Sequence, residues 1–569
     1  MSAPQFLAYI GSAGTPQPSN EAIPKGFRSL GEVGSTRVFA KASSAISPEQ
    51  ERDGLGIAIS AVPPNRQFNQ TNHHTIWDPK DALGLDVRIE TRGNDIEVVR
   101  GRSGMMPCLV TKIASTTVIA SDISTLLEAG MNKPSLNEQV VADALVFPGI
   151  MGRDTALMNV YELFPGERAN IKGGRTEICA DWTPLCKLGT PIANYGEAVR
   201  TVYQAVELAF DVLNTRISDA IVTVSGGLDS SIVGAMAARH FRNTRFVTFY
   251  TRDPLGDERE YARALASHCG VELIELDVSE DSNTLRPSAG LHLPRPSART
   301  SGKAMSAALL SLAREHGAEA ILNGFGGDNV FCYMQSSTPL IDRLHSDSGF
   351  TGLAETARDL MELANCSLPD LLKHSVRSFA RHRRSGKRYN WTRETQFLSD
   401  DLAARMAPAY PHPWLNQARS SNLGHLNRSA LITRTHPFLE RFDRRLGVPY
   451  ISPLLTGVVL DACLRVSSWL WCRGGINRAV ARDAFSSILP ERILTRRTKG
   501  SPVAAYAKTF SDNRDDLVEL LGSGFLARTG MLDKDSVISF LRQPDAEFDG
   551  AFLRVLDLAD IEGWCREFA

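Results

Sequence analysis

The sequence predicts an α/β protein with a β-rich N-terminal part, a doubly wound parallel sheet and a helical C-terminal part. Three observations support this prediction. Short apolar runs separated by Gly, Asn, Asp and Ser fill residues 1–190, strands alternate with helical periods from 195 to 322, and a helical period dominates from about 340 to 569. Because 569 residues exceed what one hydrophobic core organises, we expect two domains, 1–190 and 191–569.

The N-terminal part is predicted to consist mainly of strands. Its apolar or alternating runs have the length and the period of two that are typical of strands. They are Phe6–Ile10, Leu85–Ile89, Ile96–Val99, Cys108–Ile113 and Thr117–Ala120. The pairs Pro165-Gly166 and Gly173-Gly174 mark later turns.

The central part alternates between helices and strands. A helix with apolar residues at Val202, Val206 and Phe210 leads into a strand at Ile221–Val224. The alternation continues with a strand Phe246–Tyr250, a helix Glu258–His268, a strand Leu273–Leu276, a helix Ala304–His316 and a strand Ala320–Leu322. Such alternation predicts a parallel, doubly wound sheet, which binds ligands at the carboxyl ends of its strands.

The first candidate site is the glycine loop Ser225–Ser231, which follows the strand Ile221–Val224 and opens a helix. Gly226 and Gly227 let the backbone turn tightly and approach a ligand. The N–H groups at the start of the helix and the serine hydroxyls are suited to phosphate oxygens, and the Asp229 carboxylate is suited to Mg²⁺. The loop lacks the lysine of the G-x-x-x-x-G-K-[ST] motif. The alternative is a plain glycine turn between a buried strand and its helix.

A second glycine loop, Gly324–Asp328, follows the strand Ala320–Leu322. Its three glycines again allow close backbone approach, and Asp328 supplies a second carboxylate. One carboxylate seldom holds Mg²⁺ alone, so we predict that Asp229 and Asp328 share the ion with phosphate oxygens and water. The alternative is that Asp328 caps a helix.

Composition argues against several classes of protein. A net charge of -1 gives no general reason to expect nucleic acid as a partner. Nine cysteines without a C-x-x-C pair argue against a disulfide framework or a zinc site and favour a reducing compartment. The N-terminus lacks the features of a signal peptide, and no apolar run reaches about 18 residues. We therefore expect a cytoplasmic protein without a membrane span.

A basic segment is conspicuous at residues 377–388. Charge runs of this kind usually form a solvated surface, and we favour that interpretation. The alternatives are a mobile element that docks a peptide or protein partner, or a nucleic-acid site, which lacks any companion motif here.

Several motifs together carry a family resemblance. The loop Ser225–Ser231 resembles the pyrophosphate-binding loop of the ATP pyrophosphatases. Together with Gly324–Asp328 it resembles the synthetase domain of the asparagine synthetase B family, as do the segments Arg252–Pro254, Asp257-Glu258, Val448–Leu455, Leu489–Ile493 and Arg496–Gly500. The N-terminal part resembles that family's glutaminase-like, Ntn-type domain at Gly101–Pro107, Ala120–Ile123 and Glu162–Glu167. The resemblance is absent from about 340 to 430.

Two departures from the family pattern bear on the reaction. Members that hydrolyse glutamine use a cysteine at position two, whereas this chain begins Met1-Ser2 and has its first cysteine at Cys108. A serine is a much weaker nucleophile than a thiolate, so we expect no glutaminase activity. Phe325 stands where asparagine synthetases carry a glutamate between two glycines. The resemblance therefore implies that the amine is part of a larger substrate rather than ammonia.

Family members with this profile form amides in natural-product pathways. The run Gly326–Tyr333 is most similar to the lasso peptide macrolactam synthetases, or lasso cyclases. This similarity implies adenylation of an Asp or Glu side chain of a precursor peptide, ring closure by its N-terminal amine, and a leader peptidase and a leader-binding protein as partners. A β-lactam-synthetase-like or ammonia-dependent asparagine-synthetase-like ligase acting on a small molecule is an alternative. A non-enzymatic scaffold is a third, although the intact phosphate loop argues against it.

The resemblance also implies roles for individual residues. ATP would place its triphosphate on the loop residues Ser225, Gly226, Gly227 and Ser230, and its adenine near Val224, Thr248 and Gly324. Asp229 and Asp328 would hold Mg²⁺. Lys499 matches the family's late lysine and would stabilise charge on the reacting phosphate. Its alternative is a solvated lysine beside Arg496 and Arg497.

Overall fold

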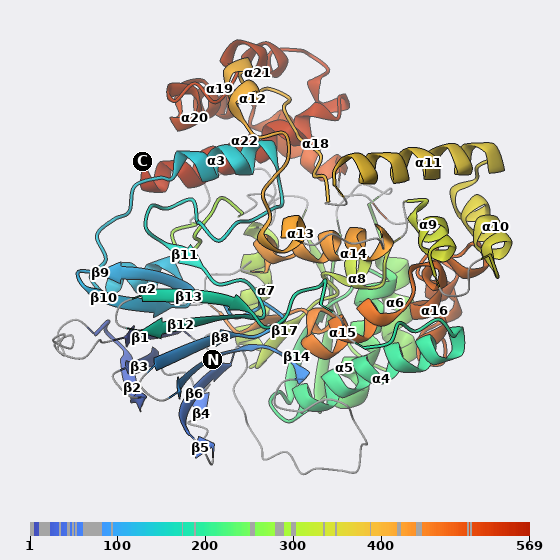
Figure 1. Cartoon of the computed structure of the whole chain (residues 1–569), viewed down its shortest axis with the longest axis horizontal. Coiled ribbons are helices and arrows are strands. Elements are labelled where there is room, and N and C mark those ends of the chain that lie inside the picture. The colour runs from blue at the N-terminus through green and yellow to red at the C-terminus, as the bar shows by residue number, and fades with distance from the viewer. Residues whose placement is uncertain are drawn as a thin grey trace.

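The described residues of this computed structural model form three β-sheets surrounded by helices (Figure 1). The structure describes residues 5–10, 23–33, 36–41, 46–47, 50–51, 54–60, 82–92, 95–172, 175–186, 189–250, 256–278, 290–297, 303–333, 336–346, 350–386, 389–417, 423–439, 447–497, 500 and 503–569. The α/β fold class predicted from the sequence is confirmed.

Two antiparallel sheets make up the N-terminal part. The first has the order β11 (Tyr161–Glu162), β9 (Leu109–Ile113), β10 (Thr116–Ala120), β1 (Gln5–Ile10), β3 (Thr36–Lys41) and β2 (Phe27–Val33). The second has the order β13 (Arg175–Ala180), β12 (Glu167–Lys172), β8 (Asp95–Arg100), β7 (Asp86–Arg92), β6 (Gly54–Ser60) and β4 (Ile46–Ser47), with β5 (Gln50–Glu51) beside β6. The predicted turn at Gly173-Gly174 lies outside the described residues, and β12 and β13 pair in antiparallel fashion on either side of it.

Strand β1 is buried on both faces because the first sheet is covered on both sides. Phe6 and Ala8 belong to the core that the two sheets share. Leu7 and Tyr9 point the opposite way, as the period of two in a strand requires. They join a second core with the helices α2 (Ile123–Glu128), α3 (Glu138–Val146) and α22 (Ala551–Phe568).

The third sheet is parallel throughout. Its order is β16 (Leu273–Asp277), β15 (Asn243–Tyr250), β14 (Asp219–Thr223), β17 (Ala320–Leu322) and β18 (Tyr450–Ile451). The chain therefore builds outwards from β14 in one direction and then returns to build in the other. This order, with helices on both faces, confirms the predicted doubly wound sheet.

Helices cover both faces of this parallel sheet. One face packs on α4 (Tyr195–Asn214), α5 (Leu228–His240) and α6 (Arg259–Cys269), and the other on α7 (Lys303–Glu315). Alternate strand residues separate accordingly: Val222 and Leu322 lie in the first core, whereas Ile221 and Ile321 lie in the core that contains Leu309 of α7.

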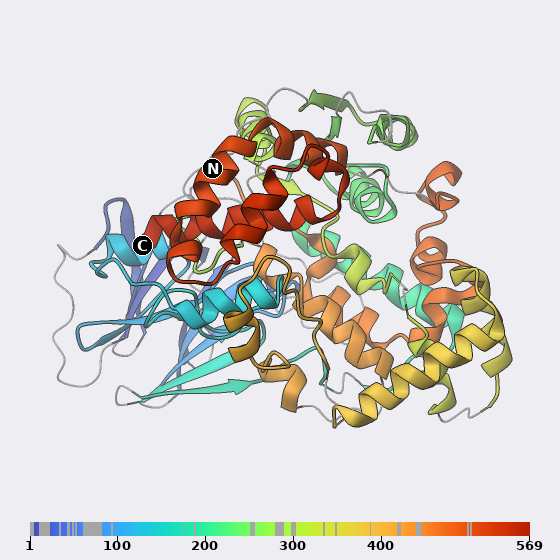
Figure 2. The ribbon, with the colours of Figure 1, turned by 90° about the horizontal axis from the view of Figure 1, so that it is seen from above.

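The C-terminal part is helical, as predicted. Its α-helices are α8 (Gly327–Val330), α9 (Thr338–Leu344), α10 (Leu353–Ala364), α11 (Leu368–Arg384), α12 (Asp400–Arg405), α13 (Pro413–Gln417), α14 (Leu423–Thr433), α15 (Gly457–Arg465), α16 (Ala479–Ala484), α17 (Glu491–Leu494), α18 (Val503–Asp512), α19 (Arg514–Ser523), α20 (Phe525–Arg528), α21 (Lys534–Leu541) and α22. Its 3₁₀ helices are η4 (His436–Phe438), η5 (Pro453–Leu455), η6 (Ser468–Gly475) and η7 (Ala546–Phe548). Figure 2 shows the helices α18–α22, in red, lying over the N-terminal sheets.

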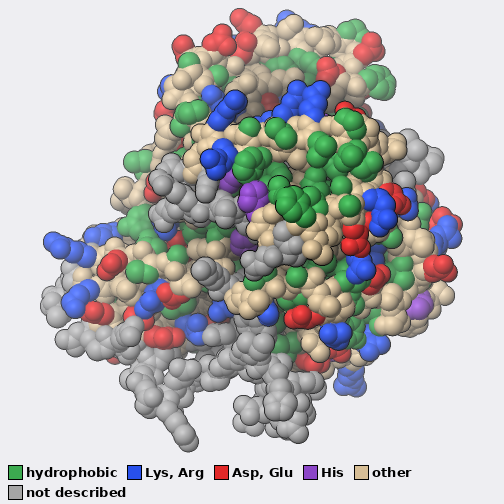
Figure 3. Space-filling model, turned by 45° about the vertical axis from the view of Figure 1, so that its right-hand side comes forward, with side chains coloured by type: hydrophobic (Ala, Val, Ile, Leu, Met, Phe, Trp, Pro, Cys, Tyr) green, Lys and Arg blue, Asp and Glu red, His purple; other side chains and the backbone are tan. Residues whose placement is uncertain are grey.

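Most of the basic segment forms the end of α11. Its arginines Arg377, Arg381, Arg383 and Arg384 are exposed, while His382 is buried. Figure 3 shows hydrophobic side chains together with Lys and Arg on the face over which α11 runs. The described part of the segment is therefore a solvated helix surface, which agrees with the favoured interpretation.

A buried ion-pair triad links the N-terminal part to the segment before α7. Arg100 Nη1 lies 2.7 Å from Glu162 Oε1, and Arg295 Nη1 lies 2.5 Å from Glu162 Oε2. Burial alone would raise the pKa of Glu162, but the guanidinium groups of Arg295 and Arg100 outweigh it and hold that pKa below its ordinary value. The carboxylate is therefore ionised and forms an ion pair with each of the two buried guanidinium groups.

A second buried carboxyl group, Asp342, joins three C-terminal elements. It lies on α9 and accepts hydrogen bonds from Ser468 Oγ of η6 at 2.6 Å and from the N–H of Gly424 in α14 at 2.9 Å. Burial raises its pKa from 3.8 to about 6, although both hydrogen bonds act in the opposite direction.

Among the described residues, no helix combines the length and apolar character that crossing a membrane requires.

Candidate active site

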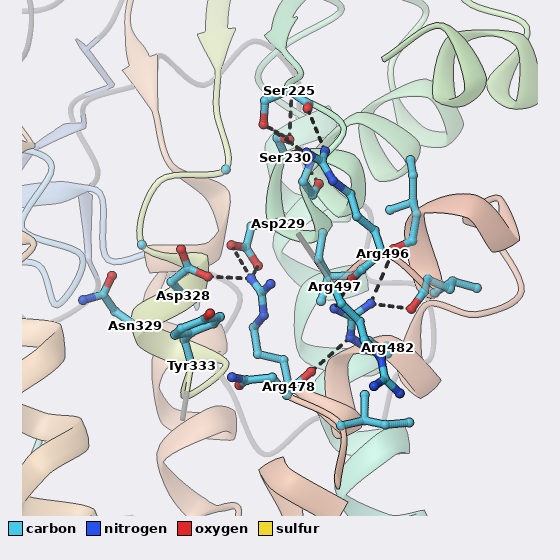
Figure 4. Close-up of a pocket in the computed structure, with 18 of the residues that line it drawn as sticks. Ser225, Asp229, Ser230, Asp328, Asn329, Tyr333, Arg478, Arg482, Arg496 and Arg497 are labelled. Carbon is cyan, nitrogen blue, oxygen red and sulfur yellow. Dashed lines mark hydrogen bonds and ion pairs between the residues drawn. The ribbon is translucent and has the colours of Figure 1, made fainter. Parts of the chain in front are cut away.

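The two predicted glycine loops lie side by side. Strands β14 and β17 are hydrogen-bonded neighbours, although the chain visits β15 and β16 between them. Their carboxyl ends therefore open at the point where the strand order reverses, which is the usual ligand site of a doubly wound sheet. Figure 4 shows Asp229 of the first loop facing Asp328 of the second across this point, with Ser225 and Ser230 of the first loop above them.

Two glycines make the close approach of these loops possible. A Cβ atom on Gly324 would lie 2.4 Å from the backbone nitrogen of Ser230, and one on Gly327 would lie 2.4 Å from Cβ of Asp229. Both distances are far shorter than a van der Waals contact, so neither position accepts a side chain without moving the first loop. The glycines therefore bring Asp328 to Asp229.

The first loop is shaped by its own serines. The N–H of Ser225 donates to Ser230 Oγ at 3.2 Å, and that hydroxyl donates to the carbonyl of Gly227 at 3.2 Å. Helix α5 then begins at Leu228 without a side-chain cap, which leaves its first N–H groups directed at the cavity. The sequence suggested that the Ser231 hydroxyl also binds phosphate oxygens. Ser231 is fully buried, however, so its hydroxyl is not available to a ligand in the cavity.

The carboxylates of Asp229 and Asp328 converge on one atom. Arg478 Nη1 donates to Asp229 Oδ1 and Oδ2 at 3.0 and 2.9 Å, and to Asp328 Oδ1 at 2.5 Å. The predicted pair is thus brought together, and a cation lies between its members (Figure 4). Sequence reasoning missed Arg478, because it lies outside both loops and belongs to no motif.

Other arginines fix the segment that follows α17. Arg482 donates to the backbone carbonyls of Ile493, Leu494 and Arg496. Arg496 pairs with Glu258 at 2.5 Å, and its guanidinium lies 3.8 Å from the ring centre of Tyr261. Lys499 itself lies outside the described residues, so its predicted catalytic role stays a prediction.

Together these elements line a cavity of about 1630 Å³. The predicted residues Val224, Ser225, Gly227, Asp229, Ser230, Gly324 and Asp328 line it. Gly226 does not line it and instead turns at a φ of 67°, where a Cβ would meet Tyr261. Thr248 does not line it either: it is 1% exposed, while Val247 and Phe249 on the opposite face of β15 line the cavity.

Several apolar side chains also line the cavity. Phe325 lies in the second loop and Tyr333 follows it, Met305 and Leu309 belong to α7, and Ile476 follows η6. Phe325, which is 38% exposed, is among the few large apolar side chains that the fold leaves open to solvent. The cavity therefore combines a polar loop suited to phosphate groups with apolar side chains suited to a less polar ligand.

The donor set at the two carboxylates fits a hard divalent cation. Within the described ranges, no group of three or more His, Cys, Asp or Glu side chains is arranged to hold a metal ion. Mg²⁺ commonly uses one or two carboxylates and takes its remaining ligands from substrate phosphates and water. Asp229 and Asp328 already direct oxygens to one point, so they fit Mg²⁺ bound together with a nucleotide.

Comparisons with known proteins identify the family of the chain. A sequence model of the asparagine synthase family matches residues 219–566. No curated protein sequence matches significantly. Among solved structures, a glutamine-dependent NAD⁺ synthetase from Acinetobacter baumannii, in complex with ADP, matches at 14% identity over 31% of this chain and 32% of its own, with a TM-score of 0.19. Because the family model spans more than half of the chain, the chain belongs to the asparagine synthase family.

Proposed function

We propose that this protein closes a peptide into a macrolactam of the lasso type at the expense of ATP. Membership of the asparagine synthase family implies an ATP-dependent amide ligase. The finer proposal is that an Asp or Glu side chain of a precursor peptide becomes an acyl-adenylate, with release of pyrophosphate. The peptide's N-terminal amine then displaces AMP and forms the ring amide.

The size of the cavity is the observation that carries the proposal. Pockets for small ligands commonly enclose roughly 300–1,000 Å³, whereas this one encloses about 1630 Å³. It therefore has room for a nucleotide and for a second, larger substrate. Phe325 supports the same view, because a hydrophobic side chain cannot assist ammonia as a carboxylate would.

Individual residues have defined tasks in this proposal. Ser225, Ser230 and the N–H groups at the start of α5 bind the triphosphate, and Val224 and Gly324 border the adenine. Mg²⁺, held by Asp229 and Asp328, would neutralise charge on the departing pyrophosphate. Lys499 would stabilise charge on the reacting phosphate. The proposal also keeps Gly226 as the turn of the loop, whereas Thr248, which does not line the cavity, has no part in it.

Ring closure needs the amine and the acyl-adenylate held together. Holding two reacting groups in the correct geometry can contribute about 7–11 kcal/mol to the rate. The exposed side chains of Phe325 and Tyr333 are suited to contacting a folded peptide there. We propose a leader peptidase and a leader-binding protein as partners, which prepare this peptide.

The proposal includes a structural role for the N-terminal domain and a cytoplasmic location. Residues 1–190 form the glutaminase-like domain without the nucleophilic cysteine, and residues 191–569 form the synthetase domain. All nine cysteines are free, as is usual in a reducing compartment.

Mass spectrometry of a reaction with ATP and Mg²⁺ tests the proposal. Candidate precursor peptides are those encoded beside this gene, after removal of their leaders. We expect AMP, pyrophosphate and a peptide that has lost one water, without added ammonia, and no product with the Asp229→Asn variant. A product that requires ammonia would favour the asparagine-synthetase-like alternative. A small-molecule lactam without any peptide product would favour the β-lactam-synthetase-like one.

A further inference from the structure

The cation between the two carboxylates belongs to the protein itself. Arg478 is 12% exposed at its side chain, and its partners Asp229 and Asp328 are 13% and 43% exposed. Without a cation, two carboxylates this close would repel each other, and burial would strengthen the repulsion. Arg478 therefore holds the two glycine loops in register when no metal is bound.

The same atom stands where a shared metal ion would have to be. Three of the four carboxylate oxygens accept hydrogen bonds from Nη1 of Arg478 at 2.5 to 3.0 Å. A Mg²⁺ ion bridging these carboxylates would need the same space, because its ligand distances are about 2.1 Å. The guanidinium and the metal therefore exclude each other.

We infer that Arg478 is a built-in competitor of the divalent metal and admits the ion only together with a nucleotide. This inference rests on the proposed use of ATP and Mg²⁺ by the same site. It assigns Arg478 the role of a positioning residue, which acts through Asp229 and Asp328.

The surroundings of Arg478 explain why the nucleotide matters. Burial lowers the pKa of Arg482, and the nearby positive charge of Arg478 lowers it further. The two guanidinium groups therefore repel each other. A guanidinium displaced by metal alone would lose charge-assisted hydrogen bonds and move within a cluster of cations that also includes Arg496 and Arg497. A bound triphosphate supplies new anionic partners for it. Metal and nucleotide are thus expected to bind cooperatively.

Arg478 is also held in a constrained backbone conformation. It precedes α16 with a φ of 59°, in the left-handed region that non-glycine residues rarely adopt. Its guanidinium lies 5.2 Å from the ring centre of Tyr333, which belongs to the segment after the second loop. A solvated surface arginine would need neither this backbone conformation nor this aromatic contact. Both features therefore support a defined position of the Arg478 charge at the carboxylates.

Binding of Mn²⁺, used as a spectroscopic substitute for Mg²⁺, tests this inference. Free Mn²⁺ is measured by electron paramagnetic resonance with the wild type, Arg478→Gln and Arg497→Gln, each with and without α,β-methylene-ATP. Arg497 is the matched control, because it is exposed, lines the same cavity and forms no ion pair within the described part of the chain. Both variants remove one positive charge.

We expect Arg478→Gln to bind Mn²⁺ alone at least about tenfold more tightly than the wild type, and Arg497→Gln to stay within about threefold. The nucleotide analogue should tighten Mn²⁺ binding strongly in the wild type and much less in Arg478→Gln. Equal Mn²⁺ affinities of the wild type and Arg478→Gln without nucleotide would overturn the inference. It would also be overturned if the analogue tightened Mn²⁺ binding equally in Arg478→Gln and Arg497→Gln. If the Gln variant does not fold, an equal Mn²⁺ affinity of the wild type with and without the analogue would overturn it too. Failure of the wild type to bind the analogue would instead refute the proposed use of ATP.

Discussion

Replacing Gly324 by alanine should separate the two glycine loops. The added Cβ would lie 2.4 Å from the backbone nitrogen of Ser230, 2.7 Å from its Cα and 2.8 Å from the carbonyl carbon of Asp229. All three are backbone atoms, so no side-chain rotation relieves the contact. The φ of Gly324 is not in the left-handed region, so the effect comes from the close approach alone.

The size of the effect follows from these distances. Non-bonded heavy atoms in contact lie roughly 3.5 Å apart, so the loops must part by about 1 Å. A displacement of about 1 Å at a site that binds by precise geometry can cost on the order of 100-fold. The stability cost should stay near 1–3 kcal/mol, which is typical of one methyl group added to a packed position.

Calorimetry with α,β-methylene-ATP and Mg²⁺ measures this loss of affinity, and thermal unfolding measures the stability. Gly550→Ala is the matched control, because its Cβ would meet nothing within 4 Å and its φ of -54° suits alanine. A Gly324→Ala protein that binds the analogue within about threefold of the wild type would refute the reasoning, since the loops would then not need their close contact.

Three further predictions concern buried or paired carboxyl groups. Asp229→Asn should weaken Mg²⁺-dependent binding of α,β-methylene-ATP at least about 100-fold in calorimetry, with an unchanged circular dichroism spectrum. The pKa of Asp342 in the folded protein, about 6, exceeds its ordinary value of 3.8. Ionisation of this residue therefore lowers the free energy of unfolding as the pH rises from about 4 to 6. In urea unfolding, the free energy of unfolding of Asp342→Asn relative to that of the wild type should therefore rise by on the order of 3 kcal/mol across that window. A difference between the two proteins that does not change with pH would contradict the raised pKa of Asp342. Glu162→Gln leaves Arg100 and Arg295 buried without an anion and should lower the free energy of unfolding by about 3–5 kcal/mol, again by urea unfolding. An unchanged urea midpoint would show that this triad is not needed for the fold.

The parallel sheet could be predicted because its signals are local. The alternation of strand and helix patterns from 195 to 322 appears in the sequence without knowledge of distant contacts. It implied that the loops after β14 and β17 lie at the same edge, and the structure confirms that β14 and β17 are neighbours. Strand β18 was not predicted, since two residues cannot show a period, and its place depends on pairing with β17 from a distant part of the chain.

The environment of the carboxylates could not be predicted from sequence. Nothing in the residues around Arg478 marks it as different from the other arginines of the C-terminal part. Its position depends on the path of the chain at the end of η6 and just after it, where Gly474, Gly475 and Arg478 all have positive φ. A side chain placed by such tertiary turns leaves no pattern in the sequence. By contrast, the role of Gly324 was predictable in kind, because a glycine after a buried strand indicates close backbone approach.

The first sheet and the last helix of the chain share a hydrophobic core. Leu7 of β1 and Phe568 of α22 belong to one hydrophobic cluster, so α22 covers a face of the first sheet. The pair between Glu162 and Arg295 adds a second link across the predicted boundary near residue 190. Losing the N-terminal sheets would expose the apolar face of α22 and leave Arg295 without its anion, each at a substantial cost in free energy. The N-terminal part therefore stabilises the fold that holds the two glycine loops.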